Sequence, residues 1–318
     1  MKEFIIKNND QDQRVDKFIL KAFPSLQKSV MYKAIRTKNI KLNGKRCDIS
    51  TRLKEGDVLR LFISDDLLGT QKKEKKRNFS GGRGLARNEI IYEDENIILI
   101  NKKVGVIVHS DNKNDTDTLA DRLKNYLYKQ GEYIPENENT FAPALCNRLD
   151  RNTSGIVIGA KNASALREIN KKIKENTIVK KYLCLLAAKP KLMKATLTGF
   201  HRKDNATNTV TVRAEEFEGS KPIITKYRVL DPNFKNGVLT EVELVTGRTH
   251  QIRAHMAFIG CPLVGDTKYG DKSVNEKSGF RYQALCAYRL MFKKTEEDNV
   301  LKYLEGREFE NGDIFFLI

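Results

Sequence analysis

The chain lacks the features by which secreted, membrane-spanning and zinc-binding proteins are usually recognised. Its 318 residues include five cysteines, an odd number without CxxC spacing, which argues against a disulfide framework and a zinc site. No apolar run is long enough to cross a bilayer, and residues 1–18 contain no apolar signal-peptide core. We therefore expect a protein of the reducing cytoplasm with no membrane association.

Signals for bound cofactors are missing as well. The sequence has no P-loop, and no GxGxxG segment follows a predicted strand. His250 and His255 stand five positions apart without a third ligand nearby, which disfavours a metal site. The chemistry is therefore expected to rest on the protein's own side chains, with no cofactor and no metal.

Positive charge is abundant and concentrated near the N-terminus. The chain has 58 Lys and Arg against 41 Asp and Glu, a net charge of +17. Residues 1–63 hold 15 basic and 7 acidic residues, residues 64–88 hold 7 and 3, and the remainder holds 36 and 31. A basic segment attracts polyanions because each neutralised phosphate releases condensed counterions. The distribution favours an RNA-binding head on a balanced body, although Lys-rich proteins also carry such charge for solubility.

The first 63 residues are expected to form a small α+β domain. Apolar residues recur at helical spacing in RVDKFILKAF, where Pro24 ends the helix, and in SLQKSVMYKAIRTKN, where Ser25 suits the N-cap. A short strand in IKLNGKRC runs into an Asn43-Gly44 turn, and RLKEGDVLRLFI supplies a further strand. Residues 64–88, with a charge run and four glycines, are too poor in apolar side chains to fold and are predicted to be a linker.

Residues 89–318 are expected to form a strand-rich α/β domain. Helices are predicted in LADRLKNYLYKQ and ASALREINKKIKEN. Strands are predicted in EIIYEDENIILI around an Asp-Glu-Asn turn, and in VGVIVHS, SGIVIGAKN and KKYLCLLAA. From Thr196 onward, TVTVRA, ITKYRVL, GVLTEVELVTG and the closing GDIFFLI alternate with the period of two that is typical of antiparallel strands.

A carboxylate between two arginines stands out in NRLDRNTSGIVI, residues 147–158. Asp150 lies on a predicted loop directly before a buried strand. Its flanking arginines favour the ionised carboxylate, which can act as a nucleophile. An RLDR string also forms surface ion-pair clusters, so this segment alone does not separate catalysis from an ordinary ion pair.

Three further segments carry side chains that could complete a site. Tyr182 begins a predicted strand in KKYLCLL, where its ring could stack on a base or could simply belong to the core. TGRTHQIRAHM places His250 and Arg253 one turn apart if it begins a helix, so that Arg253 can hold a carboxylate in a bidentate pair. The loop GCPLVGDTKYG, residues 260–270, has glycines that permit close approach of the backbone.

These segments together resemble the RluA-type pseudouridine synthases. The resemblance rests on RLD-x-x-TSG, K-Y, GRTHQIR-x-H and G-x-P-x-x-GD-x-x-YG in this order, and it covers essentially all of residues 89–318. Residues 14–63 resemble the S-four RNA-binding domain that many of these enzymes carry in front. Within them, QKSVMYKAIRTKNIKLNGKR resembles the subgroup that modifies large-subunit ribosomal RNA.

The resemblance implies a fold and an activity. The fold is α/β (α+β): a pseudouridine synthase fold with a central, largely antiparallel mixed sheet flanked by helices, after a small α+β S-four-like domain. The activity is isomerisation of specific uridines to pseudouridine in RNA, with large-subunit ribosomal RNA as the expected substrate. The resemblance also implies a monomer, and no DNA is expected as a partner.

The resemblance further implies roles for individual residues. Asp150 would be the catalytic carboxylate, Tyr182 would stack on the target uracil, and Arg253 would pair with the Asp150 carboxylate. Arg148 would help to displace or replace the flipped base. The other side chains expected to contact RNA are Asn147, Arg151, Lys28, Lys33, Arg36, Lys41, Lys45, Arg46, Arg248 and His250.

The sequence departs from the family pattern at two places. The family usually has His before RLD, where this chain has Asn147, and it usually has K-P-x-G where this chain reads Lys102-Lys103-Val104-Gly105. Neither position is the expected nucleophile, so the departures bear on RNA contacts and target choice. Two other functions fit part of the sequence: an RNA-binding or ribosome-assembly protein without catalysis, and a nucleoside hydrolase, which needs a second carboxylate across the site. Asp266 is expected to be structural rather than that second carboxylate.

Overall fold

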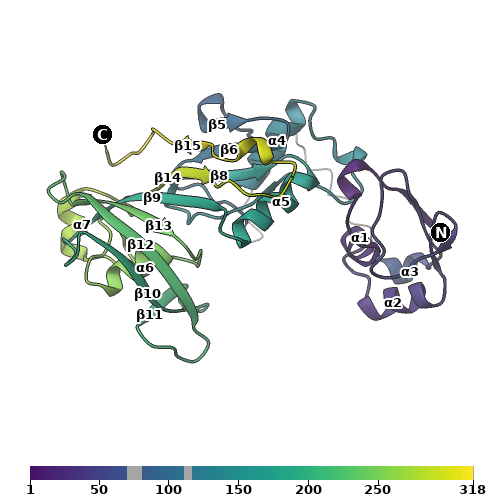
Figure 1. Ribbon diagram of the computed structural model, residues 1–318, viewed down its shortest axis with the longest axis horizontal. Helices are drawn as coiled ribbons and strands as arrows, with labels where there is room; N and C mark the ends of the chain where they lie inside the picture. The colour runs from purple at the N-terminus through teal and green to yellow at the C-terminus, as the bar shows by residue number, and fades with distance from the viewer. Residues whose placement is uncertain (70–80, 111–116, 318) are drawn as a thin grey trace. The chain divides into compact units, whose positions relative to one another are not determined.

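The computed structural model describes residues 1–69, 81–110 and 117–317, and Figure 1 shows its elements. The contacts within the chain define two compact units. The first comprises Met1–Leu85, Asp121–Ala144 and Ala160–Leu166, and the second comprises Ala86–Ala120, Leu145–Gly159 and Arg167–Ile318. The division predicted at residues 63 and 88 stays a prediction, and residues 70–80 of the predicted linker lie outside the described residues.

The first unit contains a small antiparallel sheet and two helices with an apolar side. Its elements up to residue 69 are β1 (Lys2–Ile5), η1 (Asn8–Asp10), α1 (Val15–Ala22), α2 (Lys28–Arg36), β2 (Ile40–Leu42), β3 (Lys45–Arg46), β4 (Val58–Leu61) and α3 (Asp65–Leu68). The strand order is β1-β4-β2-β3. Asn43 and Gly44 have positive φ angles of 50° and 75°, which confirms the predicted tight turn between β2 and β3. The ring of Phe4 packs edge-on against that of Phe18 in the core, 5.4 Å between centroids.

Two details of this unit correct the sequence-based prediction. The N-cap position of α2 is Gln27, and the Ser25 hydroxyl instead donates to the carbonyl of Leu68. A turn after Phe23, closed by the N–H of Leu26, separates Ser25 from the helix. Leu68 lies inside the predicted linker, yet it ends α3 and is buried in the core because its side chain is apolar.

The second unit is built on a large mixed sheet. Its strands are β5 (Ile90–Glu93), β6 (Ile97–Lys102), β7 (Ala144–Leu145), β8 (Ser154–Ala160), β9 (Ile178–Leu186), β10 (Lys194–Asp204), β11 (Thr209–Arg213), β12 (Lys221–Asp231), β13 (Val238–Leu244), β14 (Leu285–Phe292) and β15 (Glu308–Glu310). The remaining helices are η2 (Arg87–Glu89), α4 (Leu119–Lys129), η3 (Pro135–Asn137), α5 (Ala163–Lys174), α6 (Gln251–Phe258), α7 (Lys272–Ser278) and η4 (Lys302–Leu304). α4, η3, β7, β8 and α5 include residues of the first unit.

The order of the strands explains where the sheet is most buried. It runs β11-β10-β12-β13-β9-β14-β8-β6-β5, antiparallel from β11 to β14, and β14 pairs with β8 in parallel. β8 is buried at every position, as expected of a central strand covered on both faces. Gly155 of β8 has φ 112°, and a Cβ atom there would lie 2.2 Å from the carbonyl oxygen of Ala287 in β14. The predicted mixed, largely antiparallel sheet flanked by helices is confirmed.

Two predicted strands do not form, and one strand was missed. Residues 104–110 form turns and bends, because the carbonyls of Ile107 and Val108 accept the first N–H groups of α4 instead of pairing with a strand. The closing segment, as far as residue 317, is also irregular, and Ile314 and Phe316 pack as single side chains into a core cluster. β14, which is buried at nearly every position, was not predicted.

Candidate active site

Asp150 lies in the loop that leads into the central strand β8. The loop is tied to the strand through Asn147, whose side-chain oxygen accepts the N–H of Ile158 at 2.8 Å. Within the loop, the N–H of Thr153 donates to the carbonyl of Asp150 at 3.0 Å. The Asp150 side chain keeps 24% of its surface exposed. A buried strand therefore holds a carboxylate that solvent or a ligand can still reach.

Arg253 of α6 is shared between two carboxylates. Its Nη1 donates to Oδ2 of Asp150 at 2.9 Å, which confirms the expected ion pair. Its Nε and Nη2 form a bidentate pair with Asp266, at 2.7 and 2.9 Å. Burial alone would lower the pKa of Arg253, but its bonds to Asp266 and the charges of both carboxylates raise the pKa. The bidentate partner is thus Asp266, and Asp150 receives a single bond.

Asp266 serves as the anchor for this arginine. Its side chain is fully buried, and its Oδ1 also accepts the backbone N–H groups of Lys268 and Tyr269. Burial alone would raise the pKa of Asp266, but the Arg253 bonds and the two N–H donors hold it below its usual range. Both oxygens of Asp266 accept from protein donors and the side chain is buried, as expected of a structural carboxylate.

His250 stands immediately before α6 and faces the same carboxylate as Arg253. Its Nε2 lies 3.8 Å from Oδ2 of Asp150, and its Nδ1 is hydrogen-bonded to the Tyr269 hydroxyl at 2.9 Å. Burial lowers the pKa of His250 to about 4, the positive charge of Arg253 acts in the same direction, and Asp150 opposes both. The imidazole is therefore neutral at pH 7. Only 8% of the side chain is exposed, so the structure places His250 beside Asp150 rather than on an exposed RNA-binding face.

Tyr182 lies in the middle of β9, not at its beginning as predicted. Its neighbours across the sheet are Val242 of β13 and Ala287 of β14. Burial raises the pKa of the Tyr182 hydroxyl well above its usual range, and the charge of Asp150 raises it further. The phenol is thus a neutral group within the electrostatic reach of the carboxylate. Stacking on a base stays a prediction.

Lys102 is a buried residue at this site whose role the sequence did not reveal. Its ammonium donates to the carbonyls of Lys103, Val106 and Arg151, at 3.1, 3.0 and 2.9 Å. Three acceptors match the three N–H donors of an ammonium group. Burial lowers the pKa of Lys102 to about 7, although the charge of Asp150 opposes the shift. Lys102 therefore joins the turn after β6 to the loop that carries Asp150.

Gln251 is a second residue that the sequence did not single out. Its side-chain oxygen accepts the Thr246 hydroxyl and the N–H of Arg248, both at 3.0 Å. Its amide nitrogen donates to the carbonyl of Ile224 and to the Thr225 hydroxyl of β12. Because this amide is fully bonded, it fixes the start of α6 against the sheet. The one available signal was its place inside GRTHQIR.

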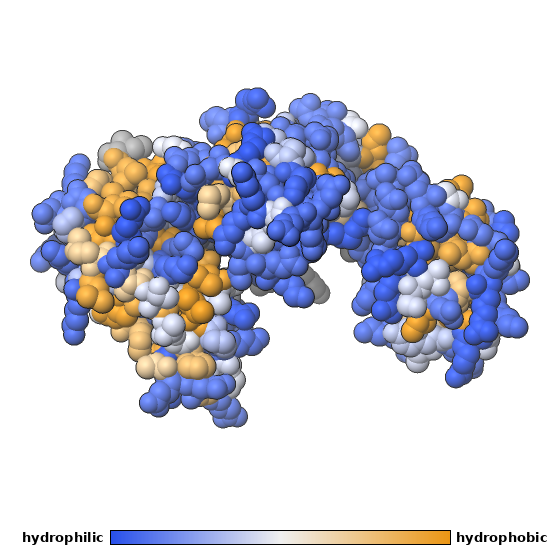
Figure 2. All heavy atoms as spheres, in the orientation of Figure 1, coloured by the Kyte–Doolittle hydropathy of each residue, from blue (hydrophilic) through white to orange (hydrophobic). Residues whose placement is uncertain are grey.

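The remaining predicted RNA contacts fall into two groups. Arg148 and Arg151 are exposed on either side of Asp150, and Arg248 is exposed before α6. The other group belongs to the first unit, on α2, β2 and β3: Lys28, Lys33, Arg36, Lys41, Lys45 and Arg46. On the face drawn in Figure 2, hydrophilic residues cover most of this unit, with small groups of apolar residues between them. The structure does not bring Asn147 to an exposed face, since its amide is bonded to the backbone of β8.

The described residues contain neither a group of metal-ligating side chains nor a membrane-spanning helix. No three His, Cys, Asp or Glu side chains there are grouped so that they could hold a metal ion. No helix in the same ranges is long and apolar enough to cross a membrane. All five cysteines carry free thiols.

Comparison with known proteins identifies the family. A family model described as RNA pseudouridylate synthase matches residues 96–258, and the S4 domain model matches residues 13–59. An uncharacterised RNA pseudouridine synthase of Mycoplasma genitalium is 34% identical over 92% of this chain and 90% of its own length. A ribosomal large subunit pseudouridine synthase C of Rickettsia felis is 31% identical over 90% of this chain and 92% of its own.

A solved structure agrees with this assignment. Human RNA pseudouridylate synthase domain containing 1 superposes with a TM-score of 0.55 at 26% identity, covering 73% of this chain and 86% of the human one. The chain belongs to the RNA pseudouridylate synthase family and carries an S4 domain at residues 13–59. It is an RNA-binding isomerase that converts uridine in RNA to pseudouridine, which confirms the resemblance seen in the sequence.

Proposed function

We propose that this enzyme isomerises uridines of large-subunit ribosomal RNA and that Asp150 is its catalytic carboxylate. Relatives named ribosomal large subunit pseudouridine synthase C support the substrate, at about one third identity over most of the chain. The basic charge of the first 88 residues supports a large, highly charged RNA. The observation that carries the catalytic role is the Asp150 carboxylate held by Arg253 at one oxygen only.

The two oxygens of Asp150 have different surroundings. Oδ2 takes the bond from Arg253 and faces His250, while within the described residues no donor binds Oδ1. A fixed carboxylate with one open oxygen is already oriented for reaction, so little entropy is lost on reaching the reactive geometry. Oδ1 either attacks the anomeric carbon of the target nucleotide or assists removal of a sugar proton. Both routes separate the base from the sugar and allow it to rejoin through carbon.

The groups around Asp150 suit a detached uracil. The neutral Tyr182 phenol can stack on the ring with its face and donate or carry a proton with its hydroxyl. Arg148 and Arg151 are exposed next to the catalytic loop, where they can contact the phosphates or replace the flipped base. Flipping a base out of a stem requires a few kcal/mol, roughly the unstacking free energy, which contacts to RNA phosphates supply.

We further propose that the protein is a monomer of the cytoplasm. The monomer is what the resemblance to the RluA-type synthases implies. Its free thiols suit the reducing cytoplasm. DNA is not an expected substrate, because the proposed reaction acts on uridine.

Replacing Asp150 tests the proposal directly. Asp150→Asn keeps the shape and a hydrogen-bond acceptor for Arg253 but removes the negative charge, so we expect pseudouridine formation to be abolished. The measurement is chemical mapping of pseudouridine in 23S-type ribosomal RNA, together with the dissociation constant for that RNA. Binding is expected to change less than about threefold, because the basic side chains of the first unit are intact.

Two controls complete this experiment. Asp231→Asn, at the end of β12, changes a carboxylate of the same unit outside the site and should leave both readouts unchanged. More than residual turnover by Asp150→Asn would show that another group performs the chemistry. Pseudouridines that persist in ribosomal RNA of a strain without the gene, but vanish from transfer RNA, would show that the substrate is wrong while the chemistry is right.

A further inference from the structure

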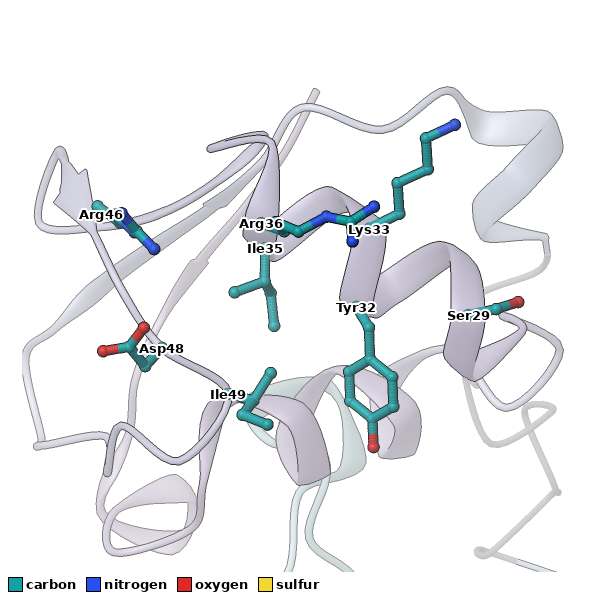
Figure 3. Close-up of a pocket in the computed structure, with 8 residues that line it drawn as sticks. All are labelled: Ser29, Tyr32, Lys33, Ile35, Arg36, Arg46, Asp48 and Ile49. Carbon is teal, nitrogen blue, oxygen red and sulfur yellow. The ribbon is translucent and has the colours of Figure 1, made fainter.

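An open cavity lies on the first unit, between α2 and the segment that follows β3. Its volume is about 380 Å³, and Figure 3 shows the side chains that surround it. They are Ser29, Tyr32, Lys33, Ile35, Arg36, Arg46, Asp48 and Ile49. The catalytic loop plays no part in this cavity, so its chemistry has to be explained separately.

Apolar side chains form the centre of the cavity. Ile35 and Ile49 point toward one another in Figure 3, with the Tyr32 ring beside Ile49. Tyr32 is 43% exposed and Ile49 is 39% exposed, whereas Ile35 is buried. An aromatic ring and two branched side chains at one opening form a surface on which another flat ring can be packed and removed from water.

Positive side chains surround this apolar centre. Lys33 and Arg36 extend from α2 on one side, and Arg46 comes from β3 on the other. In residues 1–69 and the other described ranges, no ion pair joins any of these three to a carboxylate. Three cations outnumber the one carboxylate that lines the cavity, Asp48, and so attract a phosphate-bearing ligand.

We propose that this cavity binds one unstacked nucleotide of the RNA substrate, with its base on Tyr32 and Ile49 and its phosphates among Lys33, Arg36 and Arg46. The proposal rests on the proposed RNA substrate and adds a site for an unpaired residue outside the catalytic centre. Stacking on an aromatic side chain together with cations that follow the backbone is how single-stranded RNA is commonly held. A continuous duplex has no base available for the apolar centre.

Asp48 adds a preference among bases. Its carboxylate lines the same cavity, on the side of Arg46. A carboxylate accepts hydrogen bonds from exocyclic amino groups, such as the one on cytosine, whereas uracil has a carbonyl at that position. The cavity is therefore expected to favour a base with an amino group over uracil, which also separates it from the catalytic site.

The absence of tryptophan from the sequence allows a direct test. Tyr32→Trp places the one indole of the protein in the cavity, where a stacked base quenches its fluorescence. The full-length protein is titrated with ten-nucleotide oligo(C), oligo(U) and a ten-base-pair RNA duplex. We expect quenching that saturates with oligo(C), weaker binding of oligo(U), and little quenching with the duplex. The matched control is Tyr128→Trp, since Tyr128 on α4 is similarly exposed at 37%.

Affinities of three variants separate stacking from charge. Tyr32→Ala should weaken oligo(C) binding about 5- to 100-fold, while Tyr32→Phe should restore it, because stacking needs the ring and not the hydroxyl. Arg36→Gln should lower the slope of log K against log salt by about 0.7, which is one phosphate contact on a single strand. Asp48→Asn should reduce the preference for oligo(C) over oligo(U).

The outcomes that overturn the proposal are distinct from those that overturn the catalytic assignment. Equal oligo(C) affinity for Tyr32→Ala and the unchanged protein, or equal losses on oligo(C) and duplex, would exclude a base in the cavity. Tyr32→Ala should raise the RNA concentration that gives half-maximal pseudouridine formation, whereas Asp150→Asn should not form pseudouridine at any concentration. Unchanged thermal unfolding of Tyr32→Ala verifies that the first unit remains folded.

Discussion

Arg253 stands between two carboxylates that differ in exposure. Asp266 is completely buried and takes two bonds, while Asp150 keeps 24% of its side-chain surface and takes one. Asp266 accepts from Nε and Nη2, and Nη1 donates to Asp150. The buried pair fixes the guanidinium, and the guanidinium in turn orients the reactive carboxylate. Bonding to both carboxylates in this geometry requires a planar group with several donors. A lysine ammonium cannot provide it.

Arg253→Lys tests this division of bonds. The substitution keeps the charge but removes the bidentate geometry, leaving buried carboxylate oxygens without donors. We expect the free energy of unfolding to fall by about 3 kcal/mol, the usual range for a broken buried pair, and the maximal rate to fall more than RNA affinity. Chemical denaturation and single-turnover kinetics measure the two effects. Arg289→Lys, which disturbs the more exposed pairs of β14 with β15, should change neither by a comparable amount.

His250 gives the site a defined pH dependence. The folded-state pKa of about 4 lies below the ordinary value of 6.5, so the unfolded chain binds a proton in this interval that the folded protein does not. The stability of the protein is therefore unaffected by His250 above pH 6.5 and falls as the pH decreases toward 4. His250→Gln should remove this part of the loss, about 3 kcal/mol at pH 4. Thermal unfolding of both proteins between pH 7 and pH 4 is the measurement, and parallel curves would contradict the assignment.

At the scale of single elements, the close approach of β8 to β14 is the most restrictive feature around the catalytic loop. Gly155 has a φ angle of 112°, and it lies directly after Ser154, where β8 begins. A side chain at this position would overlap the carbonyl of Ala287, and the backbone angle itself is unfavourable for residues with a Cβ. The glycine of the TSG segment is thus required by packing next to the reactive loop.

Gly155→Ala should destabilise the protein by more than the conformational strain alone. A positive φ in an alanine costs about 1–3 kcal/mol, and here the two strands must also separate. The matched control is Gly279→Ala, at the end of α7, where φ is 72° and a Cβ would meet no atom within 4 Å. The melting temperature should fall clearly further for Gly155→Ala. Equal decreases for the two variants would mean that the strand contact is unimportant.

The predictions of helices and strands from the sequence were correct where the local pattern was sufficient. α1 ends at Ala22, just before Pro24, and β2–β3 turns at Asn43-Gly44. They failed where a distant partner decided the backbone bonds. Residues 104–110 have a strand-like composition, yet their carbonyls cap the start of α4. β14 was missed as well, although β6 and β8 are more completely buried and were predicted from their apolar runs.

At the scale of the whole molecule, charge and chemistry belong to different segments of the chain. The first 88 residues carry +12 of the net +17, whereas Asp150, Arg253 and Asp266 all belong to the second unit. Deleting residues 1–63 would be a poor test of this arrangement. Asp10, for example, accepts hydrogen bonds from Asn139 and Thr140 of the same unit, which deletion would expose. Charge substitutions in the intact protein avoid this damage.

Three lysines of the first unit provide such a test. We expect their combined change to Gln to lower the salt dependence of RNA binding, by a slope of up to about 0.9 for each lost phosphate contact. The maximal rate of pseudouridine formation should be retained at saturating RNA. The residues are Lys28, Lys41 and Lys45. The control removes the same total charge from exposed lysines of the second unit, Lys189, Lys191 and Lys235. Identical salt slopes for both triple variants would contradict a dedicated basic face.

The sequence by itself was sufficient to recognise features that depend on residues close together in the chain. These are Asp150, its neighbouring TSG segment, the basic first 63 residues and the missing cofactor motifs. The partition of Arg253 between two carboxylates, the neutral state of His250 and the bonds of Lys102 could not be recognised in it. They join residues far apart, such as Asp150 and Arg253 at a separation of 103, and burial sets their charges. Local order follows from neighbouring side chains, whereas the order of strands in the sheet decides which distant groups come together in one largely buried site.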